Sequence, residues 1–168
     1  MALDKEGLKN KILAETEQLN TPESANNALW KAICDYIEEN AEVIYQWSAY
    51  NSDGSPDPKT EWTGKIIVSG SLSPCGKDTP SDALSSITSS MNSNVNSWTI
   101  EPESGFDVSG ETITNSGIDL QLSMADTRDA ALLSIASDII DGIKKATPPV
   151  MSGSHGSYQG STTSGKIE

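Results

Sequence analysis

Residues 28–44 read ALWKAICDYIEENAEVI and predict a long amphipathic helix. The apolar residues of this stretch recur at spacings of one, three and four, so they form one broad stripe on a helix surface. Charged residues such as Lys31, Asp35 and Glu38 fall outside the stripe. A helix of this kind is stabilised mainly by packing, so we expect it to lie against a core. The stripe consists of Ala28, Leu29, Ala32, Ile33, Tyr36, Ile37, Ala41 and Ile44.

A second helix is predicted before this one, over residues 3–19. After it, Thr21 suits an N-cap and Pro22 suits the first position of the next helix. Two helices joined by so short a turn pack as an antiparallel hairpin or as an angled pair. We therefore expect an N-terminal helix hairpin over residues 1–48. The apolar side of the first helix is formed by Leu8, Ile12 and Leu19.

A small, mainly antiparallel sheet is predicted in the middle of the chain. A turn-rich loop at residues 51–60 is followed by residues 61–72, in which apolar and polar side chains alternate. Residues 118–124 alternate in the same way. This period of two is typical of half-buried strands. Shorter strand candidates are residues 98–100, 106–108 and 111–113.

Two further helices are predicted. Thr79 and Pro80 repeat the start signal of the N-terminal region and introduce a helix with the stripe Leu84, Ile87, Met91 and Val95. Asp126 and Thr127 are candidate N-caps for a last helix. That helix carries the stripe Leu132, Ile135, Ile139 and Ile143.

The last segment of the chain is rich in Gly, Ser and Thr, and we expect it to be an extended, flexible arm over residues 148–168. Its sizeable apolar groups are Tyr158 and Ile167, which we select as candidate partner-contact residues. The predicted fold is therefore α+β. The N-terminal helix hairpin packs as one domain with an α+β core over residues 49–147, which consists of the sheet and the two further helices, and the C-terminal arm follows.

The charge of the chain limits its partners. Asp and Glu number 24 and Lys and Arg number 11, so the formal net charge is −13. A chain this negative is repelled by phosphate backbones and by anionic lipid surfaces, so we expect no nucleic-acid and no membrane partner. The start of the sequence lacks the pattern of a secretion signal, and no apolar run is long enough to span a bilayer. We expect synthesis in the cytoplasm. Whether Cys34 and Cys75 pair is open.

Two loops invite a test for ligand chemistry. Residues 70–77 resemble a phosphate-binding loop, but the glycine spacing is one residue too long and Asp78 stands where Ser or Thr is needed. In the loop 51–60, Asn51, Asp53, Ser55 and Asp57 follow the alternating spacing of a calcium loop. Trp62 occupies the twelfth position, where a bidentate Glu belongs. We favour structural loops in both places, with cation binding by loop 51–60 left open.

No catalytic, cofactor-binding or metal-binding residue is predicted. The single histidine, His155, lies in the predicted arm, and a general base needs a rigid neighbourhood. Glu101 and Glu103 could act as paired carboxylates of a small hydrolase, but in a chain with 24 acidic residues such pairs arise by chance. We expect most of the four tryptophans, Trp30, Trp47, Trp62 and Trp98, to be core residues. The protein is therefore not expected to be an enzyme.

Two stretches of the chain carry a family resemblance. Residues 28–43 resemble the pattern A-L-x-x-A-I-x-x-Y-I-x-x-N-A-x-V of small virion proteins of tailed bacteriophages. Residues 153–167, with their repeated glycines, are similar to the Gly-rich ends of the same proteins. Together the two stretches cover a little under a fifth of the chain.

The resemblance implies a non-enzymatic structural protein of the tail, baseplate or neck, present in several copies in the virion. Its partners would be other virion proteins and copies of itself. An alternative function is a ligand- or glycan-binding surface module, in which the loops 51–60 and 101–117 hold the ligand. Ligand-dependent stabilisation of the isolated protein would distinguish this alternative from assembly.

Overall fold

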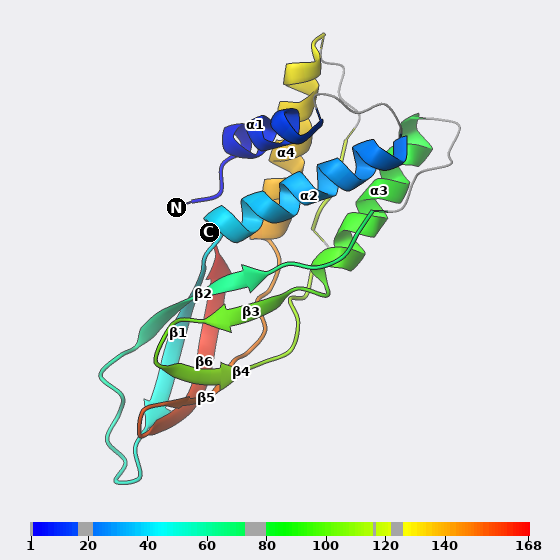
Figure 1. Ribbon diagram of the computed structural model, residues 1–168. Coiled ribbons are helices and arrows are strands. Elements are labelled where there is room, and N and C mark those ends of the chain that lie inside the picture. The colour runs from blue at the N-terminus through cyan, green and yellow to red at the C-terminus, as the bar shows by residue number, and fades with distance from the viewer. Residues whose placement is uncertain (1, 17–21, 73–79, 116, 122–125) are drawn as a thin grey trace.

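The computed structural model describes residues 2–16, 22–72, 80–115, 117–121 and 126–168. The molecule is elongated, with the helices gathered at one end and the strands at the other (Figure 1). The helices in the described residues are α1 (Lys5–Thr16), α2 (Pro22–Asn40), α3 (Pro80–Val95) and α4 (Arg128–Lys144). The strands are β1 (Val43–Tyr50), β2 (Glu61–Ile67), β3 (Thr99–Pro102), β4 (Phe106–Ser109), β5 (Ser152–His155) and β6 (Tyr158–Ile167).

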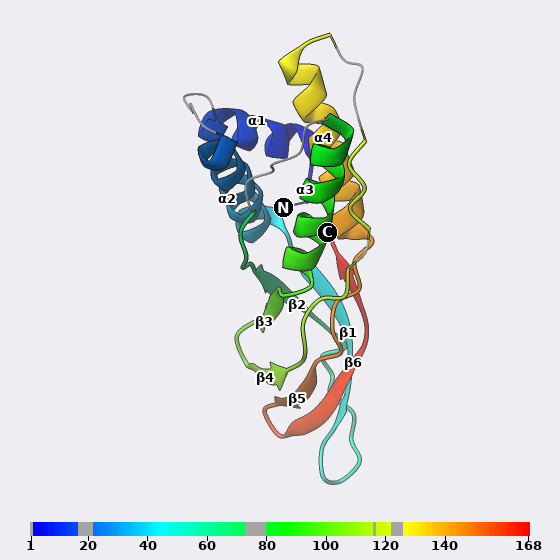
Figure 2. The same ribbon diagram turned by 90° about the vertical axis from the view of Figure 1, so that its right-hand side faces the viewer.

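The strands form one antiparallel sheet in the order β3-β2-β1-β6-β5-β4. Its two edge strands, β3 and β4, are consecutive in the chain and are joined by residues 103–105 alone. Because this short turn brings the two edges together, the sheet curls into a nearly closed, barrel-like form (Figure 2). The α+β class and the N-terminal helix pair agree with the prediction.

The predicted end of the long helix, at residue 44, is wrong. The helix ends at Asn40, whose side-chain amide donates to the Tyr36 carbonyl at 2.9 Å. The chain then becomes β1, in which buried and more exposed side chains alternate. Ala41 and Ile44 continue the helical spacing by coincidence, and this spacing hid a strand whose inward residues are Val43, Tyr45, Trp47 and Ala49.

The predicted flexible arm is also wrong, because residues 152–167 form β5 and β6 within the sheet. β6 lies between β1 and β5, so hydrogen bonds on both sides hold its main chain. Glycine permits this close packing. A Cβ at Gly160 would overlap with the Ser48 carbonyl oxygen, and one at Gly165 would lie 2.6 Å from the Tyr45 ring. The composition typical of a flexible tail is here the composition of a tightly packed strand.

The predicted strands after β4 are likewise corrected. Residues 111–113 and the described part of 118–124 belong to no named strand, although Ile113, Ile118 and Leu120 are buried in alternation. The Ile113 amide donates to the Trp98 carbonyl at 2.9 Å, whereas a side chain bonds the backbone of Ile118. Asn92 accepts from the Ile118 amide at 3.1 Å and donates to the Ile118 carbonyl at 2.9 Å. Residues 122–124 lie outside the described part.

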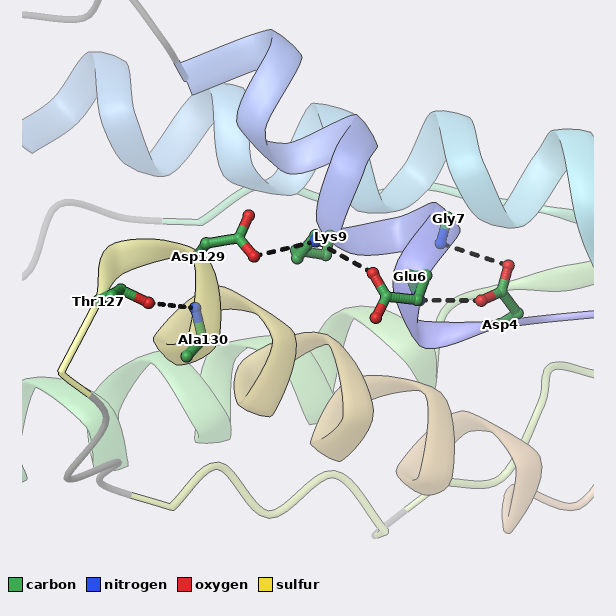
Figure 3. Close-up of polar contacts among 7 residues, drawn as sticks. All are labelled: Asp4, Glu6, Gly7, Lys9, Thr127, Asp129 and Ala130. Atoms are coloured by element: carbon green, nitrogen blue, oxygen red, sulfur yellow. Dashed lines mark hydrogen bonds and ion pairs between the residues drawn. The ribbon is translucent and has the colours of Figure 1, made fainter.

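The predicted starts of the helices are partly tested. Asp4 caps α1, accepting from the amides of Glu6 at 2.9 Å and Gly7 at 3.3 Å. The predicted N-cap Thr127 is confirmed for α4, because its hydroxyl accepts from the Ala130 amide at 3.1 Å (Figure 3). Of the two candidates for α4, Thr127 and not Asp126 is therefore the N-cap. The predicted helix starts at Thr21 and Thr79 lie outside the described residues.

An ion-pair bridge joins α1 to α4. The Lys9 ammonium lies 3.0 Å from Glu6 on its own helix and 3.1 Å from Asp129 at the start of α4 (Figure 3). The Lys9 side chain is 11% exposed. Hydrogen bonds to Glu6 and Asp129 raise the pKa of Lys9 above its ordinary value, against an opposing effect of desolvation. The bridge therefore fixes the position of α1 across the helical end.

One hydrophobic core runs through both ends of the molecule. It begins among the helices, with Ile33 and Ile37 of α2 and Ile139 of α4, and continues into the sheet. In the described residues, no helix is long and apolar enough to cross a membrane. The side chains that are most completely buried include Leu8, Ile12, Tyr45, Trp62, Ile66, Met91, Trp98, Ile113 and Ile143.

Candidate functional site

The candidate site lies in the sheet half of the molecule, away from the helices. Here the loop between β1 and β2, the turn between β3 and β4, and the hairpin formed by β5 and β6 meet (Figures 1 and 2). The contacts that join these segments involve Asp57, Lys59, Glu103, Phe106 and His155, which we call the distal cluster. The cluster contains the only histidine of the chain and its most buried carboxylate in the described residues.

Asp57 points into the protein, and its side chain is 1% exposed. Three donors surround its carboxylate: the Trp47 indole N–H at 3.0 Å, the Lys59 amide at 2.9 Å and the His155 Nδ1 at 2.6 Å. Burial alone would raise the pKa of Asp57. The hydrogen bonds, with that from His155 first among them, outweigh burial and hold this pKa below its ordinary value. Asp57 is therefore an ionised anchor.

His155 is the last residue of β5, and its side chain is 30% exposed. It stands opposite Phe106 in the β4–β5 ladder. The two rings are stacked, with centroids 4.3 Å apart and an angle of 5° between the planes. An ionised carboxylate accepts hydrogen bonds only, so the contact with Asp57 places a proton on Nδ1 of His155.

An aromatic cluster supports the His155 ring from inside the sheet. Phe106 contacts Trp62 at 5.2 Å and Trp47 at 5.4 Å between centroids, and Trp62 contacts Tyr45 at 4.6 Å. These contacts confirm that Trp47 and Trp62 are core residues, as predicted. Trp30 and Trp98 are also buried and contact each other at 5.9 Å. The imidazole therefore rests on a rigid base.

Loops 51–60 and 101–117, which the alternative function assigns to ligand binding, meet at this cluster. Lys59 forms an ion pair with Glu103 at 3.2 Å, and its ammonium lies 5.5 Å from the centroid of the Phe106 ring. The other carboxylate oxygen of Glu103 accepts from the Thr63 amide at 2.9 Å. Glu103 is thus committed to structural contacts, while Glu101 stands opposite Lys65 in the β2–β3 ladder.

The loop 51–60 does not gather its oxygen ligands around one point. Asp53 accepts from the Ser55 amide at 2.9 Å, and Asn51 accepts from the Asp53 amide at 3.2 Å. Asp57 turns inward to Trp47 and His155. Over the described ranges of the chain, no group of three or more His, Cys, Asp or Glu side chains is arranged to hold a metal ion.

The predicted partner-contact residues are both in the C-terminal hairpin. Ile167 is 1% exposed and stands opposite Val43 in the β1–β6 ladder. Tyr158 is half-buried, packs against the core and stands opposite His155. The structure therefore places Ile167 in the core of its own chain, and partner contact through these two residues stays a prediction.

Of the two cysteines, only Cys34 lies within the described residues. Cys34 is half-buried on α2 and carries a free thiol. Burial raises the pKa of Cys34 to about 12, and the charges of Asp35 and Glu38 act in the same direction. A thiol with so high a pKa is a poor nucleophile. Cys75 lies outside the described residues.

The distal cluster holds and orients an imidazole. Among the described residues, the hydrogen-bond partner of the His155 ring is Asp57. The sequence prediction placed His155 in a flexible tail and missed this pair. One signal was present, because residues 155–158 read HGSY, and a Gly-Ser pair between two extended segments is typical of a tight hairpin. Gly156 has a positive φ of 59°, as such a turn requires.

Comparison with protein-family models, curated proteins and solved structures gives no match. The functional argument therefore depends on the residues and contacts of this chain.

Proposed function

We propose that this protein is a non-enzymatic structural component of a tailed-phage particle, in the tail, baseplate or neck. It would act through subunit–subunit contacts. The observation that carries this proposal is the pattern at residues 28–43, which resembles small virion proteins of tailed phages. Within this chain, the pattern covers the junction between α2 and β1, where the helical end meets the sheet.

The fixed positions of the pattern have identifiable structural roles. Tyr36 joins α2 to the N-terminus, because its hydroxyl donates to the Asp4 carbonyl at 2.9 Å and accepts from the Asp4 amide at 3.0 Å. Asn40 ends the helix, and Val43 begins β1 inside the core. Most of the remaining fixed positions lie in the core or pack against it: Leu29, Ala32, Ile33, Ile37 and Ala41.

The partners of such a component would be other virion proteins and copies of itself. The C-terminal arm that first suggested this role is part of the sheet, so contacts would have to form through folded surfaces. The net charge of −13 disfavours packaged nucleic acid as a partner and favours a basic protein surface. We expect synthesis in the host cytoplasm followed by incorporation into the virion.

An amber mutation in the gene tests this proposal. Particles made in a non-suppressing host should be incomplete by negative-stain electron microscopy, with tail or baseplate missing, and their infectivity should fall. Supplying the protein from a plasmid should restore complete particles. Complete and fully infectious particles made without the protein would contradict an assembly role.

A second candidate is the ligand- or glycan-binding surface module. The observation that favours it is the meeting of loops 51–60 and 101–117 through the Lys59–Glu103 ion pair, beside a half-exposed His155 stacked on Phe106. Thermal-shift measurement against a panel of glycans tests this candidate. A saturable increase in Tm that is lost in His155→Ala would support it. An unchanged Tm at millimolar glycan would contradict this second candidate function.

A further inference from the structure

The C-terminal hairpin, residues 152–168, occupies the middle of the sheet with few apolar anchors. Of its side chains, only Thr162 and Ile167 are buried. β6 nevertheless pairs with β1 from Val43 to Tyr50 and with β5 on its other side. Main-chain hydrogen bonds, each with a modest net stabilisation, therefore hold most of this segment in place.

Besides the main-chain ladders with β4 and β1, one side-chain contact joins the tip of the hairpin to the loop between β1 and β2. His155 is the residue before the hairpin turn, and its Nδ1 lies 2.6 Å from the buried Asp57 carboxylate. The sequence separation between these residues is 98. Asp57 is in turn fixed to β1 through the Trp47 indole. The contact thus joins the hairpin tip to the strand that β6 pairs with.

The charged surroundings of the contact come from three segments. Lys59 belongs to the same loop as Asp57 and pairs with Glu103 of the β3–β4 turn at 3.2 Å. Asp107 of β4 is exposed and stands opposite Ser154. Loss of the His155 donor would leave the buried Asp57 carboxylate with its Trp47 and Lys59 donors alone. A buried charge that loses a hydrogen-bond donor is strongly disfavoured.

We propose that the Asp57–His155 contact is a latch that holds the C-terminal hairpin in the sheet, and that the hairpin opens as one unit when the contact is broken. Opening removes β6 from β1 and β5 from β4, which exposes the main-chain groups of Val43–Tyr50 and of Phe106–Ser109 and the aromatic interior behind them. The helical end has its own contacts among α1, α2 and α4, so it stays folded. This inference concerns the fold and holds whether or not the protein is a virion component.

Amide hydrogen exchange on the full-length protein tests the latch. His155→Phe keeps a ring to stack on Phe106 and removes the donor to Asp57. Exchange of the β6 amides, and of the β1 amides bonded to β6, should rise roughly ten- to hundredfold. Exchange in α2 and α4 should change by less than about threefold. His155→Asn, which restores a donor near Nδ1, should recover part of the protection.

Asp53→Asn is the matched control, because this exposed carboxylate lies in the same loop and contacts Ser55 within its own turn. It should leave hairpin exchange unchanged. An equal rise in the hairpin and the helices after His155→Phe would mean global destabilisation and would overturn the proposal, as would an unchanged hairpin.

The wild-type protein provides a second test that does not depend on a variant folding. If the hairpin opens as a unit, the β6 amides should share one opening equilibrium, with less protection than those of α2 and α4. If the β6 amides are protected as strongly as those of α2 and α4, the hairpin does not open separately from the helices.

Discussion

Gly165 stands directly opposite Tyr45 in the β1–β6 ladder, and the Tyr45 ring fills the space that a side chain at position 165 would occupy. The Tyr45 hydroxyl also donates to the Pro149 carbonyl at 2.9 Å, so the ring is held from both ends. Burial raises the pKa of Tyr45 well above its usual range, so the phenol stays protonated. This relationship explains why a glycine-rich segment can be a central strand.

The first prediction concerns this contact. Gly165→Val should destabilise the protein by about 1–3 kcal/mol, because a Cβ at this position would lie 2.6 Å from the Tyr45 ring and overpacking is costly. Ser164→Ala, at the exposed neighbouring position, should change stability by less than about 0.5 kcal/mol. Urea unfolding followed by circular dichroism measures both. An equally small loss of stability in both variants would show that β6 does not pack against Tyr45 of β1 as described.

The second prediction concerns the buried carboxylate. Asp57→Ala removes the acceptor of the Trp47 indole and of His155, so it should lower the free energy of unfolding by about 2–3 kcal/mol. Asp53→Ala should cost much less, because its contacts are exposed and local. Chemical denaturation of the two variants under the same buffer conditions provides the comparison. A larger loss from Asp53→Ala would refute the anchor role of Asp57.

The third prediction concerns acid. The pKa of Asp57 is lowered by folding, so this group stabilises the protein above its unfolded-state pKa of 3.8. That contribution is lost as the pH falls from about 4 through the lower folded-state pKa. The difference in unfolding free energy between wild type and Asp57→Asn should therefore be constant near neutral pH and shrink below about pH 4. Its measurement between pH 7 and pH 2.5 checks the sign, and a difference that grows on acidification would contradict it.

The fourth prediction concerns the bridge between α1 and α4. Lys9→Met keeps the apolar stem and removes the ammonium that contacts Glu6 and Asp129, so it should lower the Tm. Lys11→Met removes the more exposed pair with Glu39 and should lower the Tm less. Because folding raises the pKa of Lys9, the stabilisation is present below its ordinary pKa of 10.5 and is lost as the pH rises through the higher folded-state value. Thermal unfolding of both variants at neutral pH tests the ranking.

Local patterns predicted the helical end well. The helix predicted over residues 28–44 is correct up to Asn40, and the strand predicted over residues 61–72 is correct up to Ile67. These two elements and the Thr127 cap depend on spacing and side-chain chemistry within one segment. The prediction failed at β1, where a period of two overlaps with helical spacing through Ala41 and Ile44. It failed at β6 because long-range main-chain pairing and glycine contacts, which a low apolar content does not reveal, stabilise that strand.

The distal cluster was only partly predictable for the same reason. Loops 51–60 and 101–117 were named together as the ligand-holding loops of the alternative function, and they meet at Lys59 and Glu103. The pairing of Asp57 with His155 depends on a hairpin that brings together residues with a separation of 98 in the sequence. Because the sequence predicts a flexible arm over residues 148–168, it does not predict a fixed partner for His155.

The central claim is that this chain is a structural component of a virion. Quantitative mass spectrometry of purified particles tests this claim most directly. Under the proposed function a phage encodes this chain, so its particles are separated on a density gradient and the ratio of this protein to the major tail protein is measured across the fractions. We predict a constant ratio through the particle peak that survives a high-salt wash. Abundance in the lysate together with absence from the particle peak would contradict the proposed function.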